Sequence, residues 1–185
     1  MLQRRSLQAV LVAAIVTILL AGAASASSVH LKGGKSAEPA FADHGLTLAA
    51  SGELSGLGNG DVLVTMTAKA DVTATCTNPA GGNKPPGQNP AAVTVSGSEA
   101  IPAGEIKNGT TPFAVETVAP PTLIPGAPGC PNTSWTETIT DLSFTAATIT
   151  VEQPPGTTVL TVACSINPAS SNGAVPAGTV SCTQS

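Results

Sequence analysis

The residues of this chain best suited to covalent chemistry are its four cysteines, Cys76, Cys130, Cys164 and Cys182. No two of them form a Cys-x-x-Cys pair, which is the spacing typical of redox motifs and zinc sites. In an exported chain an even number of cysteines predicts two disulfides, for which three pairings exist. Cys164 and Cys182 lie symmetrically about residue 173 in an expected hairpin, which favours a bridge between them. That choice leaves Cys76 to pair with Cys130.

For each other kind of catalysis we considered, the sequence does not place the required side chains where the chemistry needs them. Ser-His-Asp catalysis needs a histidine that the scaffold holds beside the nucleophile, but His30 and His44 both precede the first expected strand. The carboxylates that could pair for glycoside hydrolysis fall mostly on expected polar faces or turns: Glu99, Glu105, Glu116, Glu137, Asp141 and Glu152. We therefore predict that the protein is not an enzyme and has no catalytic residue, no metal and no cofactor.

The N-terminal segment has the three parts of a secretory signal peptide. Arg4 and Arg5 supply positive charge, residues 9–20 are apolar except for one threonine, and residues 24–26 read Ala-Ser-Ala. The apolar run is shorter than the roughly 20 residues that span a bilayer, which argues against a membrane anchor. We predict a signal peptide over residues 1–26 and an extracellular protein that is released or held loosely at the cell surface. The general export route is favoured over the twin-arginine route.

The charge of the expected mature chain excludes two classes of partner. Five basic residues remain after residue 26, against eleven acidic ones, and the basic residues do not cluster. Binding to nucleic acid requires clustered Lys and Arg, and so does attraction to anionic lipid. We expect no nucleic-acid partner and no membrane contact after signal cleavage, which leaves a cell-wall or protein partner.

Alternating side chains over residues 61–76 are the clearest structural pattern. Apolar residues occupy the even positions from 62 to 76, whereas most odd positions are Thr, Lys or Asp. Because strand side chains alternate between faces, this predicts a strand with one buried face, and its length predicts a bend or bulge near Lys69. Related patterns predict strands at 46–54, 91–96, 113–116, 160–166 and 180–182, and either two strands or one bulged strand at 135–151.

These elements predict an all-β domain over residues 45–185. Seven to nine short strands separated by Gly, Pro and Asn are typical of an antiparallel β-sandwich, here immunoglobulin-like and stapled by two disulfides, with a β-barrel as the alternative. The Asn59-Gly60 pair predicts a hairpin turn. Residues 27–44 contain Gly-Gly and Pro without a sustained period, and we expect them to form a flexible leader.

Two long loops, residues 77–90 and 119–134, are rich in Pro, Gly and Asn. Loops of this length are often functional. The simpler interpretation is that they only connect strands and are held in place by the disulfides. Trp135 follows the second loop and is either a core residue that covers a disulfide or an exposed anchor of a binding surface. With Pro125 and Pro128 it forms our set of candidate interaction residues.

Three segments carry a resemblance to known sequences: LSGLGNGDVLVT at 54–65, CTNPAGGNKPPGQNP at 76–90 and PGCPNTSWTETITDLSFTAATITV at 129–151. They resemble a group of uncharacterised secreted proteins of high-GC, soil-type bacteria, over most of the expected mature domain. The resemblance implies secretion and a β-rich domain, and it assigns no activity and no functional residue.

The function expected first is a non-catalytic structural or interaction module outside the cell or on its surface, which would need no deep pocket. A second is a carrier of an apolar small molecule, because composition, acidity and expected architecture are similar to those of the secreted enediyne-carrier apoproteins. This carrier would need an apolar cleft between sheet and loops. A third is a protease inhibitor that acts through the loop at residues 119–130.

Overall fold

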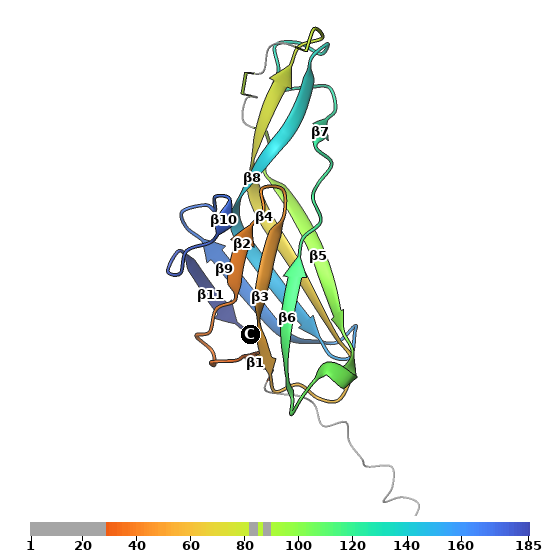
Figure 1. Ribbon diagram of the computed structural model, residues 1–185, viewed down its shortest axis with the longest axis vertical. Coiled ribbons are helices and arrows are strands. Elements are labelled where there is room, and N and C mark those ends of the chain that lie inside the picture. The colour runs from red at the N-terminus through yellow and green to blue at the C-terminus, as the bar shows by residue number, and fades with distance from the viewer. Residues whose placement is uncertain (1–28, 82–84, 87–89) are drawn as a thin grey trace, which may run out of the picture.

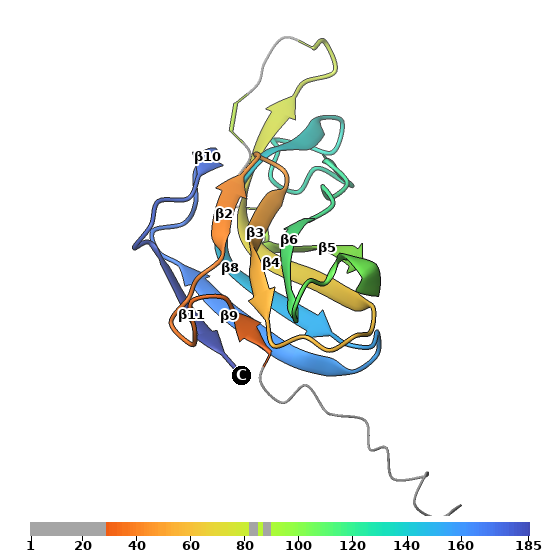
Figure 2. The same cartoon turned by 60° about the horizontal axis from the view of Figure 1, so that its bottom comes forward.

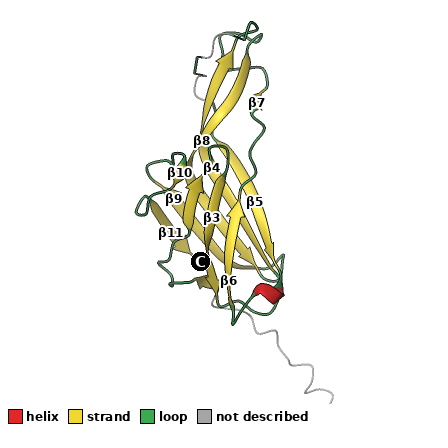
Figure 3. Cartoon of the chain, viewed as in Figure 1, coloured by secondary structure: helices red, strands yellow, loops and turns green. Residues whose placement is uncertain are grey.

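The residues that the structure describes fold into two antiparallel β-sheets with one short 3₁₀ helix (Figure 1; Figure 3). This computed structural model describes residues 29–81, 85–86 and 90–185, so the predicted signal peptide lies outside the described residues. The elements are β1 (His30–Leu31), β2 (Ala40–Asp43), β3 (Leu48–Ser55), β4 (Val62–Thr77), β5 (Val93–Ile101), the 3₁₀ helix η2 (Ala103–Glu105), β6 (Thr110–Glu116), β7 (Leu123–Ile124), β8 (Thr136–Glu152), β9 (Thr158–Ile166), β10 (Gly173–Ala174) and β11 (Val180–Gln184).

The two sheets face each other in a β-sandwich-like arrangement. In the first sheet β3 pairs with β6 on one side and with β1 and β2 on the other, and β10 extends β2. In the second the order is β11-β9-β8-β4-β5, with β7 on β8. Figure 2 shows β2, β3 and β6 lying over β4, β8 and β9. The described residues thus form eleven strands, more than the seven to nine expected, because several strands of two to four residues are too short to leave a periodic signal.

One hydrophobic core fills the space between the sheets. Its largest fully buried side chains come from both layers: Leu48, Leu54 and Val115 from the first sheet, and Met66, Leu142, Phe144 and Ile149 from the second. Aliphatic side chains dominate because the sequence contains few aromatic residues. The disulfides Cys76–Cys130 and Cys164–Cys182 are the pairs favoured by the spacing.

The expected flexible leader is wrong over residues 29–44. Leu31 in β1 and Phe41 in β2 are buried in the core, and the carboxyl group of Asp43 accepts a hydrogen bond from the hydroxyl of Ser170 inside the protein. The segment escaped prediction because strands of two and four residues show no alternation. Both become strands only by pairing with β3, which lies later in the chain.

The hairpin expected at Asn59-Gly60 is also wrong. β3 belongs to the first sheet and β4 to the second, so this connection crosses between layers. The buried side chain of Gln153 holds it: its Oε1 accepts from the Gly58 amide at 2.7 Å, and its Nε2 donates to the Gly60 carbonyl at 2.7 Å. A distant side chain therefore sets the path of a turn whose own residues favour a hairpin.

β8 is one long strand with two bulges rather than two strands. Its register against β4 shifts between Lys69 and Ala70 and again between Thr73 and Ala74, which confirms the irregularity predicted near Lys69. Thr145 and Thr140 are the extra residues, and their hydroxyls donate to the carbonyls of Lys69 and Thr73, each at 3.3 Å. After each bulge the buried positions of β8 change from odd to even residue numbers or back, which explains the two changes of apolar parity in the sequence.

A candidate interaction surface on the arm

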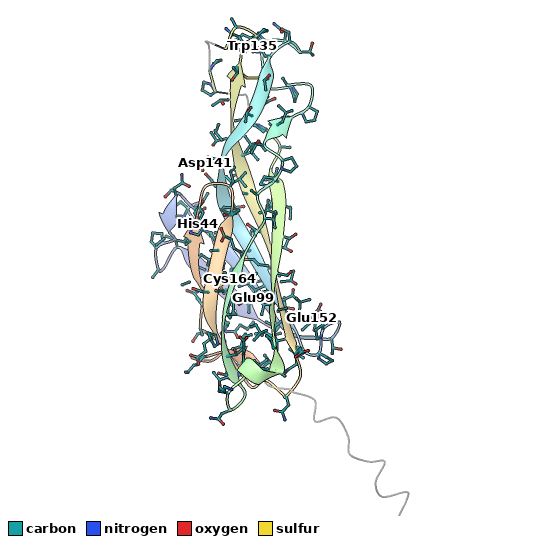
Figure 4. The ribbon with its side chains drawn as sticks, turned by 45° about the vertical axis from the view of Figure 1, so that its right-hand side comes forward. His44, Glu99, Trp135, Asp141, Glu152 and Cys164 are labelled. Carbon is teal, nitrogen blue, oxygen red and sulfur yellow. A yellow bond between two sulfur atoms is a disulfide. The ribbon has the colours of Figure 1, made fainter. Side chains whose placement is uncertain are left out.

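β4 and β8 continue beyond the sandwich as a two-stranded projection (Figure 1). We call this projection the arm and define it as residues 72–77 of β4, residues 136–141 of β8, and β7. Trp135 stands at its far end, and Asp141 lies near its junction with the sandwich (Figure 4). The alternation that buries β4 continues to Cys76, so the arm still has an inward face after the opposite sheet has ended.

The loop after β6 covers the inward face of the arm. Leu123 and Ile124 pair with β8, and the Ile139 amide donates to the Thr122 carbonyl at 2.7 Å. The Cys76–Cys130 disulfide, which we call the arm disulfide, ties the loop to the end of β4 with a Cα–Cα distance of 5.7 Å. These ties hold a proline-rich segment against the arm although most of it forms no sheet.

A groove of about 340 Å³ lies between this loop and the arm. Most of its lining is apolar and comes from the arm, from the start of β5 and from the loop: Val72, Pro90, Ala91, Val93, Ile124, Pro128, Gly129, Glu137 and Ile139. Of the three candidate interaction residues, Pro128 is in this lining. Pro125 is exposed nearby in sequence, and Trp135 is half-buried at the end of the arm.

The structure corrects two expectations here and adds two residues. Trp135 does not belong to the hydrophobic core of the described residues, so the core interpretation is wrong. The expectation that the carboxylates fall mostly on polar faces or turns does not hold for Glu137, which is only 1% exposed. Val118 and Leu123 are the large apolar side chains with the greatest exposure in the described part of the chain, at 71% and 59%. Val118 continues the alternation of β6 one residue past buried Thr117, whereas Leu123 lies in the proline-rich loop, where no alternation indicates exposure.

Glu137 is the one acidic side chain in the lining of the groove. Its place opposite Cys76 in the β4–β8 register puts it on the inward face of the arm. Its Oε2 accepts a hydrogen bond from the Gly129 amide at 2.9 Å, next to the arm disulfide. The groove therefore combines apolar walls with a buried carboxyl group.

A histidine does lie on the scaffold, contrary to expectation. His44 follows β2, and its Nδ1 is 2.9 Å from Oε1 of Glu116, which also accepts a 2.6 Å hydrogen bond from the Thr47 hydroxyl. The Thr47 hydroxyl, and next the His44 ring, hold the pKa of Glu116 below its ordinary value. The group is solvent-exposed, and the hydroxyl bonds to the carboxylate rather than to the imidazole. This order differs from the nucleophile–histidine–acid relay.

A second hollow, of about 450 Å³, lies where β1 meets the end of β11. The side chain of Gln184 borders this hollow, and its polar atoms are already hydrogen-bonded to backbone groups of the N-terminal segment. Its Oε1 accepts from the Leu31 amide at 3.0 Å, and its Nε2 donates to the carbonyls of Gly34 and Ala37 at 3.0 and 3.1 Å. We interpret this glutamine as a clamp on the N-terminal segment, and we take the arm groove as the candidate site.

The described residues contain no cluster of three or more His, Cys, Asp or Glu that could hold a metal ion. Over the same part of the chain, no helix has the length and apolar character needed to cross a bilayer. The sequence matches no protein family model and no curated protein, and the fold matches no solved structure.

Proposed function

We propose that this protein is a secreted, non-catalytic module with an immunoglobulin-like sandwich, which binds a protein or cell-wall partner outside the cell through its arm. The observation that carries the proposal is the apolar groove between the arm and its stapled loop. A groove with apolar walls and few polar groups is the usual form of a binding site. Two disulfides agree with an oxidising, extracellular location.

The exposed side chains beside the groove support the same surface. Leu123 exposes 59% of its surface although its backbone pairs with β8, and Pro125 and Pro128 are exposed beyond it. Apolar side chains grouped at one place on a surface are typical of interaction sites. Prolines and a disulfide reduce the conformational entropy that the loop would lose on binding.

The test uses the exported protein with a photo-crosslinking amino acid at one of two positions. Position 123 lies on the arm, and position 163 is an exposed site on β9 of the sandwich. Each protein is incubated with intact cells of its own source and illuminated. We expect a discrete crosslinked product from position 123 and none from position 163. Equal labelling from both positions, or none from position 123, would contradict the proposal.

The groove also favours the second candidate function, a carrier of an apolar small molecule. Its volume of about 340 Å³ lies at the lower end of the range of small-molecule pockets, about 300–1,000 Å³. Native mass spectrometry of protein purified from culture medium checks this: a carrier would show added mass that disappears on denaturation. The protease-inhibitor interpretation of residues 119–130 stays a prediction.

A further inference from the structure

The segment that includes β7 presents one large apolar side chain on an extended backbone. Leu123 exposes 59% of its surface, whereas its neighbours Thr122 and Ile124 are half-buried against the arm. This alternation is typical of a strand with one face on the protein and one face in solvent. A single exposed apolar residue is ordinary on a protein surface. What distinguishes this leucine is the backbone that carries it.

The backbone of Leu123 offers its hydrogen-bonding groups to a partner. Opposite residues of an antiparallel pair alternate between those that exchange hydrogen bonds and those that do not. The Ile139 amide donates to the Thr122 carbonyl at 2.7 Å, so these two residues form a bonded pair. Leu123 lies opposite Thr138, one position along the register, and this pair is of the other kind. The N–H and C=O of Leu123 therefore point to the edge of β7 that pairs with no strand of the described residues (Figure 1).

The chain is held on both sides of Leu123. Before it, the carbonyl of Thr122 is bonded to β8, and after it Ile124 pairs with β8. The arm disulfide fixes the same segment further along the chain. Pro121 and Pro125 restrict the backbone at the two ends of the extended stretch. A segment fixed in this way loses little conformational entropy when it binds.

These features match what a serine endoprotease recognises. An extended segment is bound through backbone hydrogen bonds along its free edge. In a serine protease, a pocket beside the catalytic serine receives one side chain, and an apolar pocket selects an apolar one such as Leu123. A cell-wall glycan has no row of backbone amides with which to extend β7, so the open edge favours a protein partner.

We propose that the peptide bond between Leu123 and Ile124 is the reactive bond of an inhibitor loop, and that Leu123 fills the apolar specificity pocket of a serine endoprotease. This inference rests on the proposed function, because it names the class of the protein partner that the arm binds. It also gives the inhibitor prediction for residues 119–130 a defined contact residue.

The ties on both sides of this bond would make the loop an inhibitor rather than a substrate. When the protease attacks, its serine oxygen bonds to the carbonyl carbon of Leu123, and the serine proton passes to the nitrogen of Ile124 as the peptide bond breaks. The new amine of Ile124 stays beside the ester because its strand remains paired with β8. The amine can attack the ester, re-form the peptide bond and return the proton to the serine.

The test measures inhibition of two purified proteases by the exported protein, with short chromogenic peptides as substrates. Chymotrypsin has an apolar specificity pocket, and trypsin has a pocket with an aspartate at its base. We expect the inhibition constant for chymotrypsin to be lower than that for trypsin by about a hundredfold, the discrimination that an apolar pocket can provide. Mass spectrometry of the same mixtures shows whether the loop is cut.

Two variants and a control locate the contact. Leu123→Ala should weaken the inhibition of chymotrypsin by about thirtyfold, the size expected for a hot-spot residue. Leu123→Lys should transfer the inhibition to trypsin, because the aspartate in its pocket pairs with lysine. Val118→Ala is the matched control, since Val118 is also a large apolar side chain, 71% exposed, but precedes the segment tied to β8. It should leave the inhibition unchanged. Position 123 lies outside the core, so its variants should fold.

Rapid cleavage between Leu123 and Ile124 without inhibition would overturn the inference, and so would equal inhibition of the two proteases. An unchanged inhibition constant for Leu123→Ala would do the same. If neither protease is inhibited while position 123 still crosslinks to cells, the inference fails and the proposed function stands. If chymotrypsin is inhibited but position 123 gives no crosslink, the partner on the cell fails while the inhibitor loop stands.

Discussion

Replacing Gly97 by alanine tests how the two sheets meet. At this residue, in β5, an added Cβ would lie 1.8 Å from the carbonyl oxygen of Glu116 and 2.9 Å from the Cα of Thr117. Both are backbone atoms, so no side chain can rotate away. The amide of Val118 also donates to the carbonyl of Ser96 at 2.9 Å, which ties the two segments together. The methyl group must therefore force β5 away from the end of β6 and the residue that follows it.

The expected cost follows from these contacts. Overpacking in a well-packed region costs about 1–3 kcal/mol, and a clash with backbone belongs at the upper end. Loss of the hydrogen bond between Val118 and Ser96 would add about 1 kcal/mol. We expect Gly97→Ala to lower the free energy of unfolding by about 3–4 kcal/mol, a large part of the roughly 5–15 kcal/mol that stabilises a typical domain.

The assay is urea denaturation with the disulfides intact, followed by circular dichroism. Gly104→Ala is the matched control, because Gly104 lies in η2 with no atom within 4 Å of an added Cβ and with an ordinary φ. It should be neutral or stabilise the fold by up to about 1 kcal/mol. A free energy of unfolding for Gly97→Ala within about 0.5 kcal/mol of the unaltered protein would refute the close approach of β5 and the β6 segment.

Ser170→Ala removes the hydroxyl that donates to the buried carboxyl group of Asp43, so we expect the free energy of unfolding in urea to fall by about 3 kcal/mol. Ser171→Ala, at the exposed serine that follows, is the control and should cost under about 0.5 kcal/mol. Thr47→Val should raise the lowered pKa of Glu116 in an NMR titration, because it removes the hydroxyl that donates to this carboxylate; an unchanged pKa would show that the hydroxyl is not a main cause of the lowering. Because the pKa of this carboxylate is lower in the folded state, its stabilising contribution is present above the pKa of the unfolded state and is lost as the pH falls through the folded value. Serine replacement of both cysteines of the arm disulfide, which spans 54 residues, should cost about 4 kcal/mol, against about 3 kcal/mol for the disulfide between β9 and β11, which spans 18; the reverse order in urea denaturation would contradict the chain-entropy account.

The long strands were predictable because their patterns are local. Alternation over residues 61–76 predicted β4, and apolar runs elsewhere predicted the positions of β3, β5, β6, β9 and β11 to within a few residues. The disulfide between Cys164 and Cys182 followed from the same logic, since β9 and β11 pair with these two residues directly opposite each other.

The candidate site was predictable only in part. The loop at 119–134 drew attention through its prolines, and Pro128 does line the groove. Glu137 has the same parity as the apolar Ile139, with no bulge between them, but a glutamate in an apolar row is ordinarily exposed to solvent, so the local pattern gave no reason to expect its burial. Burial of this side chain also depends on the loop that the arm disulfide holds over it.

Local sequence patterns were enough to predict an all-β chain, the positions of its long strands and the two disulfide pairs. Side-chain alternation and cysteine spacing are local properties that a single chain displays directly. Long-range packing alone explains why Leu31 and Phe41 belong to the core, why the Asn59-Gly60 connection crosses between sheets, and why Glu137 lines an apolar groove. Each of these depends on contacts between segments far apart in the chain, and no local pattern records which segment will cover another.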